Sequence, residues 1–251
     1  MKLTILISLL AAAAAQVSAG RCPHVNPVPD PAPAPSDTAT PAPTGGAPPA
    51  PGNPDVYYAV TLDQLNKAVP DAAADNYCSL NDRPKSCVNN KIAVDAINKA
   101  MTKYQIKRRG EAVAVIATMA LESGYWQYNM NDTPGRPGQG TRAMLMYNFV
   151  YEYAKYLFPD AVKAEWKGLE FGTAENNKTM NDVAAMVIAD EPTSFGAGFW
   201  YLSKSTTGFY NNDAALRDGN VDDFKGYLVD GIHTTAAEER ITIWNKFNEA
   251  L

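Results

Sequence analysis

The sequence has 251 residues, with 22 Lys and Arg against 27 Asp and Glu, which gives a formal net charge of −5 at pH 7. Its acidic residues are scattered rather than grouped, which argues against nucleic acids and anionic membrane surfaces as partners. No segment approaches the roughly 20 consecutive apolar residues that span a bilayer, so the sequence predicts no transmembrane anchor.

The N-terminus has the three parts of a secretory signal peptide. Lys2 supplies a positive charge, residues 3–15 are apolar, and Val17, Ser18 and Ala19 form a small-residue cleavage site. We therefore predict that residues 1–19 are a cleaved signal peptide and that the mature protein is secreted and extracellular.

Residues 20–54 are rich in proline mixed with alanine, serine, threonine and glycine. A segment with so few large apolar side chains cannot bury enough surface to fold, so we predict a disordered, semi-extended spacer. Its role is open, because a spacer either joins the chain to a missing partner or serves as a stalk. Residues 55–251 remain, and their length suits one domain with a single core.

The chain has three cysteines, which allow one intramolecular disulfide. Cys78 and Cys87 are close in sequence and are the natural pair in an oxidising compartment. Closing their short loop contributes about 2–3 kcal/mol in the chain-entropy model. Cys22 lies in the spacer and is either free or bonded to another chain.

The apolar pattern after the cysteines predicts a mainly α fold with a buried central helix and long loops. Apolar residues at helical spacing indicate an amphipathic helix over residues 91–104, capped by Asn89 or Asn90. Residues 111–121 leave almost no polar face and should form the buried helix. The segment 127–141 is rich in Asn, Gly and Pro and is predicted to be a long loop.

Further helices are predicted over residues 147–158, 181–190 and 193–203. The last helix is expected to start at a capping box formed by Thr235 and Glu238. No segment alternates like a strand. Lys107, Arg108 and Arg109 form the one basic cluster, which fits either a solvated helix end or a contact for a sugar acid or phosphate.

The residue types exclude several kinds of chemistry. His24 and His233 are the two histidines, so the sequence offers no histidine pair for zinc and no Ser-His-Asp triad. The glycines show no phosphate-binding pattern after a strand. We therefore expect no metal and no cofactor.

Glu122 is the candidate for chemistry, because it ends the predicted buried helix at the edge of the polar loop. Burial raises the pKa of a carboxyl group, and a carboxyl that stays protonated is the general acid that glycosidic bond cleavage needs. The alternative is a glutamate that merely ends a helix.

Several segments resemble the family 19 glycoside hydrolases, which include plant-type chitinases and phage endolysins. They are the predicted helices at 97–106 and 112–124, the loop 138–140, and segments 195–202 and 224–244. Residues 137–142 resemble a segment of secreted filamentous-fungal members. The resemblance implies a lysozyme-like fold over residues 85–251.

The resemblance also implies site residues. Glu122 would be the general acid, and Asp132, the one acid between Ser123 and Thr141, would be the second carboxylate or else a plain loop aspartate. In an inverting enzyme the two carboxyls are about 6.5–9.5 Å apart. The candidate substrate contacts are Ser123, Tyr125, Trp126, Gln139, Arg142 and Tyr147.

Arg142 has two possible roles, and Asn177 is a candidate for modification. Arg142 is either a ligand in a cleft or a salt-bridge partner at a helix N-terminus. Asn177 begins an Asn-Lys-Thr acceptor for N-glycosylation in a polar stretch that is expected to be a loop, which would make the protein a glycoprotein.

The leading hypothesis is a secreted, monomeric glycoside hydrolase of the lysozyme (muramidase) or chitinase type. It would cleave β-1,4-linked N-acetylhexosamine polymers, peptidoglycan or chitin, and so act in cell wall degradation. One alternative is a weak or inactive relative that binds glycans or acts as an effector. A third is a structural wall protein held on a glycosylated stalk.

Overall fold

The computed structural model describes residues 57–131, 135–217 and 220–251. They all belong to one compact unit of the chain. The predicted signal peptide 1–19, the spacer 20–54, Cys22 and Asp132 lie outside the described residues, so the predictions made for them stay predictions.

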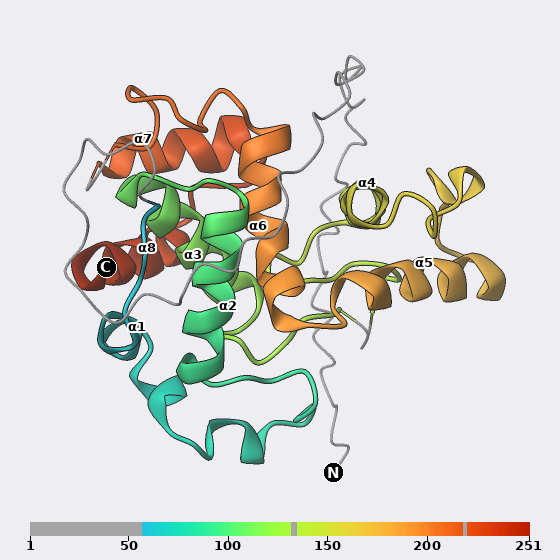
Figure 1. Ribbon diagram of the computed structural model, residues 1–251, viewed down its shortest axis with the longest axis horizontal. Helices are drawn as coiled ribbons and strands as arrows, with labels where there is room; N and C mark the ends of the chain where they lie inside the picture. Colours follow the sequence, from blue (N-terminus) through green and yellow to red (C-terminus); the bar gives the residue numbers. More distant parts are fainter. Residues whose placement is uncertain (1–56, 132–134, 218–219) are drawn as a thin grey trace, which may run out of the picture. The chain divides into compact units, whose positions relative to one another are not determined.

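The described residues are mainly helical and contain only isolated β-bridges besides helices and turns, which confirms the predicted mainly α fold (Figure 1). The helices are α1 (Leu62–Ala68), α2 (Asn90–Lys103), α3 (Arg109–Glu122), α4 (Tyr147–Leu157), α5 (Ala174–Val187), α6 (Glu191–Ser205), α7 (Val221–Gly226) and α8 (Glu238–Ala250). Short 3₁₀ turns cover Pro70–Ala73, Tyr77–Leu80 and Ala164–Trp166, and a π-helical turn covers Tyr227–Gly231.

Helix α3 is the buried central helix that the sequence predicts. Every residue from Gly110 to Ala120 except Thr118 is buried, because this stretch consists almost entirely of alanine and larger apolar residues. Helix α8 packs against α3, α2 packs against α6, and α4 packs against α5. The core is therefore built around a helix that has almost no face for solvent.

Glycine allows α6 to approach α3 closely. A Cβ atom added at Gly198 would lie 2.9 Å from the Sδ atom of Met119 and 2.9 Å from Cγ1 of Val115. Real Cβ atoms do not make such contacts, so any larger residue would push the two helices apart. The crossing of α3 and α6 is thereby fixed at this point.

The predicted boundaries are close to the observed ones for most helices, and the capping residues explain where the helices begin. The Asn89 side chain accepts a hydrogen bond from the backbone N–H of Ile92 and so caps α2. Asn90, the other candidate, is buried and bonds to other segments. Helices α4 and α6 match the predicted segments to within two residues at each end.

Two predictions at helix starts are wrong. No capping box forms at Thr235, because α8 begins two residues later: its N-cap is Ala237, which is extended and has no side chain that can cap the helix. Helix α5 begins at Ala174 rather than at residue 181, since the Thr173 side chain caps it. Asn177 therefore lies in the first turn of a helix and not in a loop.

Glu111 is a buried acid in the first turn of α3. Its side chain has no exposure, and its Oε1 accepts a hydrogen bond from the backbone N–H of Asn211. Burial raises the pKa of Glu111 to about 7, against a lowering contribution from that hydrogen bond and from nearby Arg108. The charged form of Glu111 is therefore costly in the folded protein.

We predict that the stability of the protein falls as pH rises from about 4.5 to 7. The pKa of Glu111 is raised in the folded state from an ordinary value of 4.5 to about 7, so in this window the folded state binds more protons than the unfolded state. Thermal unfolding measured across this range should show a melting temperature that declines with pH. Glu111→Gln should flatten that decline, whereas Glu175→Gln, at an exposed position in the first turn of α5, should keep it. Equal slopes in all three proteins would contradict the assignment.

Candidate functional site

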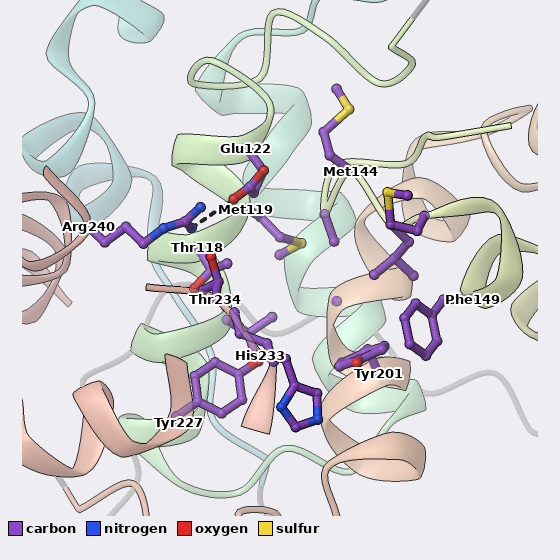
Figure 2. Close-up of a pocket in the computed structure, with 16 residues that line it drawn as sticks. Thr118, Met119, Glu122, Met144, Phe149, Tyr201, Tyr227, His233, Thr234 and Arg240 are labelled. Carbon is purple, nitrogen blue, oxygen red and sulfur yellow. Dashed lines mark ion pairs between the residues drawn. The ribbon is translucent and has the colours of Figure 1, made fainter. Parts of the chain in front are cut away.

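A cavity of about 290 Å³ lies between α3, the chain that leads into α4, α6 and the segment that leads into α8 (Figure 2). This volume is at the lower end of the range for small-molecule sites. The residues that line it are Val115, Thr118, Met119, Glu122, Ala143, Met144, Leu145, Met146, Phe149, Gly198, Tyr201, Tyr227, Ile232, His233, Thr234 and Arg240.

Most of the lining is apolar. Met119, Met144 and Met146 contribute flexible thioether side chains, which adapt to ligands of irregular shape. Phe149 and Tyr201 meet edge to face, with their ring centroids 4.8 Å apart. Figure 2 shows Met144, Phe149 and Tyr201 on the side of the cavity opposite Arg240. This side can therefore receive a hydrocarbon group.

The other side carries an ion pair. Oε1 of Glu122, the last residue of α3, lies 2.7 Å from Nη1 of Arg240 in the first turn of α8. The two side chains are 28% and 19% exposed, so the pair is partly shielded from water. Although the two atoms are close, Nη1 is buried and has no hydrogen bond of acceptable geometry. The cavity therefore combines an apolar wall with a polar end.

Two lining residues have strained backbones. Met144 has φ 45° and His233 has φ 53°, both in the left-handed region that glycine favours. For a bulky residue this conformation costs about 1–2 kcal/mol. Strained residues of this kind cluster at ligand-binding and active sites. Met144 and His233 are two of the eight non-glycine residues with positive φ in the described ranges, and the other six lie off the cavity.

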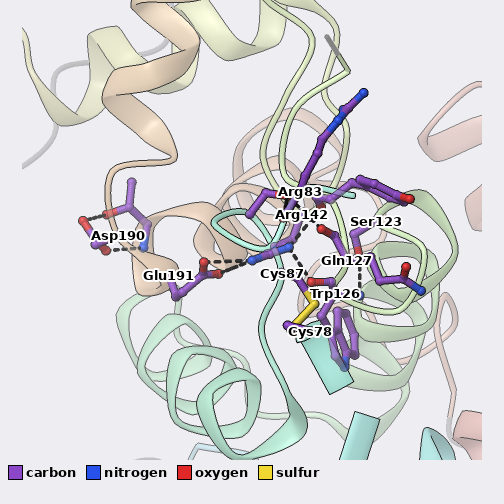
Figure 3. A network of polar contacts seen from close by, with 12 residues as sticks. Cys78, Arg83, Cys87, Ser123, Trp126, Gln127, Arg142, Asp190 and Glu191 are labelled. Carbon is purple, nitrogen blue, oxygen red and sulfur yellow. Dashed lines mark hydrogen bonds and ion pairs between the residues drawn. A yellow bond between two sulfur atoms is a disulfide. The ribbon is translucent and has the colours of Figure 1, made fainter. Parts of the chain in front are cut away.

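A buried guanidinium holds the segments beside the cavity together (Figure 3). Arg142 has no exposed surface, and two of its nitrogens donate to the carboxylate of Glu191, the first residue of α6. Its Nη1 donates to the backbone carbonyls of Trp126 and Tyr128 at 2.8 and 3.1 Å. The Cζ atom of Arg142 lies 5.4 Å from the centroid of the Phe195 ring. All sides of this cation are therefore occupied by the protein itself.

The disulfide Cys78–Cys87 is formed, as predicted (Figure 3). Its loop bonds to the chain that follows Glu122: the Tyr77 hydroxyl donates to the Tyr125 carbonyl at 2.7 Å, and the Val88 N–H donates to the Trp126 carbonyl at 3.1 Å. Because Tyr125 and Trp126 both have positive φ, they need such external support. The disulfide loop supplies it.

Of the residues predicted from the sequence, Glu122 lies on the cavity and the described others lie off it. Ser123, Trp126, Arg142 and Tyr147 are buried. The Ser123 hydroxyl bonds to the backbone of Met119 and Trp126, Trp126 donates to Asn90, and Tyr147 donates to the Trp166 carbonyl. Their polar atoms are thus engaged within the fold.

Three further predicted positions are placed on the surface side of the structure. Tyr125 is partly exposed, and the Lys246 ammonium lies 5.5 Å from its ring centroid. Gln139 bonds to the side chain of Asn131 and the carbonyl of Met144. Asn177 is half-buried, and its side-chain oxygen accepts from the N–H of Gly172. Its glycosylation stays a prediction.

Sequence reasoning missed most of the cavity. Arg240 gave no signal, because a charged residue in the first turn of a helix is usually a solvated one. Met144 and Met146 lie between the predicted loop, which ends at residue 141, and the predicted helix, which begins at residue 147, so no predicted element included them. His233 was considered together with His24, from which no zinc pair and no Ser-His-Asp triad was expected. Only an arrangement of distant segments brings these residues to one place, and neither periodicity nor short motifs report such an arrangement.

The described residues contain no group of three or more His, Cys, Asp or Glu side chains that could hold a metal ion. None of the helices in the described ranges combines the length and apolar character needed to cross a bilayer.

No protein-family model matches the chain. A bifunctional dioxygenase (DOX)-epoxy alcohol synthase (EAS) of Fusarium oxysporum (strain Fo5176) is 39% identical over 110 residues, which are 44% of this chain and 8% of that protein. The similarity therefore covers a small part of the relative, and its activity as a whole protein does not carry over.

These findings correct the functional interpretation of the sequence. The similarity is to a dioxygenase–epoxy alcohol synthase and not to a family 19 glycoside hydrolase, so the resemblance and the lysozyme-like assignment were wrong. The hydrolase function, the lysozyme or chitinase enzyme type, cell wall degradation and the polysaccharide partner are wrong with them. The segments that suggested the family are short, and a Glu-Ser or Phe-Trp pair in a helix recurs in unrelated proteins.

We predict that Arg142→Met lowers the free energy of unfolding by about 3–5 kcal/mol, because it leaves the Glu191 carboxylate and two backbone carbonyls without their partner. The measurement is denaturant unfolding. Arg217→Met is the matched control, since the ion pair of Arg217 with Asp223 holds an exposed arginine and should change stability little. Similar losses of unfolding free energy in the two variants would contradict the prediction that burial makes the contacts of Arg142 more important for stability.

Proposed function

We propose that this domain binds a small, largely apolar molecule that has a polar end, and that it does so in the cavity beside α3. The observation that carries the proposal is the composition of the lining. One wall consists of methionine, leucine and aromatic side chains, and the other ends on the Glu122–Arg240 ion pair. Pockets for small molecules combine a mainly apolar lining with a few placed polar groups in the same way.

The cavity is reachable from solvent. Met146 is 37% exposed and His233 is also exposed, while Met119 and Val115 are buried. The lining therefore runs from the surface to the core. A ligand bound there would replace water against apolar side chains, which contributes about 25 cal/mol for each Å² of apolar surface removed from water.

The partial relative supports this choice of ligand class. Its name refers to an epoxy alcohol, an organic compound that carries hydroxyl and epoxide oxygens. A compound of this kind carries at least one neutral polar group, as the proposed ligand does. The match covers 8% of that protein, so the proposal for this chain is binding and not the relative's reaction.

The proposal includes secretion, with a signal peptide at 1–19, a spacer at 20–54 and the binding domain at 55–251. It is supported by the charged, apolar and small-residue order of the N-terminus and by the disulfide Cys78–Cys87, since disulfides persist in oxidising compartments. Mass spectrometry of the protein recovered from the medium of expressing cells would test it. A mature N-terminus at residue 20 is expected, and retention of residues 1–19 would contradict it.

We predict that Thr118→Leu weakens binding of naphthalene, a neutral apolar probe, by about tenfold or more. Thr118 lines the cavity from α3, so a leucine there takes volume that the probe needs, and overpacking of this kind costs about 1–3 kcal/mol. Equilibrium dialysis measures the affinity. Thr102→Leu makes the same change on an exposed face of α2 and should bind naphthalene as the original protein does. Failure of the original protein to bind, or equal binding by both variants, would contradict the proposed site.

A further inference from the structure

Resting on the proposed function, we propose that the polar end of the ligand is a neutral hydroxyl group, held between Glu122 and Arg240, and that this pair rejects charged end groups. The pair joins the end of α3 to the start of α8 and lies on the lining of the cavity. It presents a donor and an acceptor side by side, 2.7 Å apart.

The donor is the guanidinium of Arg240, which is 19% exposed and lines the cavity. Its Nη1 is buried and faces Glu122, so this atom is not open to a ligand. A guanidinium carries five N–H donors, and the ion pair with Glu122 does not use all of them. The oxygen of a ligand hydroxyl accepts from an N–H group on the exposed part of the guanidinium.

The acceptor is the carboxylate of Glu122, which receives the hydrogen of the same hydroxyl. Thr118 competes less well than the Glu122–Arg240 pair for the hydroxyl of the ligand, because the Thr118 hydroxyl already donates to the Ala114 carbonyl at 2.8 Å. A single hydroxyl is thus matched on both sides, as donor to Glu122 and as acceptor from Arg240. Hydrogen bonds to charged groups are the stronger ones.

Charge explains the selectivity. The ion pair is neutral as a whole, so a neutral ligand adds no unbalanced charge to a partly buried site. A ligand carboxylate that approaches Arg240 also meets Glu122, and a ligand ammonium that approaches Glu122 also meets Arg240. Repulsion at such distances is stronger in this partly shielded site than it is in bulk water. The wall with Met144, Phe149 and Tyr201 then takes the hydrocarbon part (Figure 2).

The test uses four ligands of similar length: octanol, heptyl methyl ether, octanoate and octylammonium. The ether has the heavy atoms of octanol but no hydroxyl hydrogen. Octanol is expected to bind about tenfold or more tightly than the ether, which corresponds to one lost hydrogen bond to a charged group. The two ions should bind more weakly than octanol. Titration calorimetry with the folded protein measures all four.

Two substitutions add a readout that a purely structural pair would not change. Glu122→Gln leaves Arg240 as the one charge and should make octanoate bind more tightly than it does to the original protein. Arg240→Gln should do the same for octylammonium. Glu238→Gln changes an exposed acid that is not part of the cavity lining, so it is the control and should leave the order of the four ligands unchanged. Melting curves verify that each variant is folded.

The outcomes separate the two proposals. If naphthalene binds but octanol and the ether bind equally, the hydroxyl inference is overturned and the cavity remains a binding site. Unchanged affinity for octanoate in a folded Glu122→Gln protein also overturns it. If no ligand binds the original protein, both proposals fall. Should a variant not fold, the comparison of octanol with the ether in the original protein still decides the matter.

Discussion

The structure depends on a cation that has no contact with solvent. Arg142 is surrounded by the Glu191 carboxylate, the carbonyls of Trp126 and Tyr128 and the ring of Phe195. A guanidinium can be buried only when its donors are satisfied, because the cost of removing the charge from water is several kcal/mol. Burial of Arg142 therefore requires three chain segments to be in place at the same time.

Those three segments support the walls of the cavity. Trp126 and Tyr128 follow Glu122 at the end of α3, Arg142 precedes the lining residues 143–146, and Glu191 begins α6, which contributes Gly198 and Tyr201. The Arg142–Glu191 pair thus connects three of the four segments around the cavity, and the segment that leads into α8 is not part of this network. The disulfide loop reinforces the arrangement from the other side, through its hydrogen bonds to residues 125–127.

The sequence predicted the features that arise from local order. Helix α2 follows from apolar periodicity, α3 from its nearly unbroken apolar sequence, and the disulfide from the small number of cysteines. Helix α1 was missed although Thr61 and Gln64 form a capping box, because the segment is short and has few apolar residues. The start of α5 was missed because its first turns are polar.

The candidate site was predicted only at Glu122. Its partner Arg240 comes from a distant helix, and no local pattern links the two residues. Arg142 pairs with Glu191, the first residue of α6, which is the second of the two roles that the sequence left open for it. Its complete burial could not be predicted, because Glu191 and the two carbonyls that satisfy it lie in other segments. The function was predicted wrongly because short segments of the sequence were matched to family 19 glycoside hydrolases. That similarity does not extend over the chain.

The close approach at Gly198 gives the cavity two kinds of wall. Helices α3 and α6 are in contact there, so neither can slide without collision of Met119 or Val115 with the opposite backbone. The facing segments, which carry Met144 and His233, are held by turns and already store backbone strain. Thermal opening is easiest where packing is least regular. We therefore expect the proposed ligand to enter and leave through the side formed by the segments with Met144 and His233. The packed helices α3 and α6 would determine the shape of the ligand that fits. The rate at which the other side opens would determine how long the ligand stays bound.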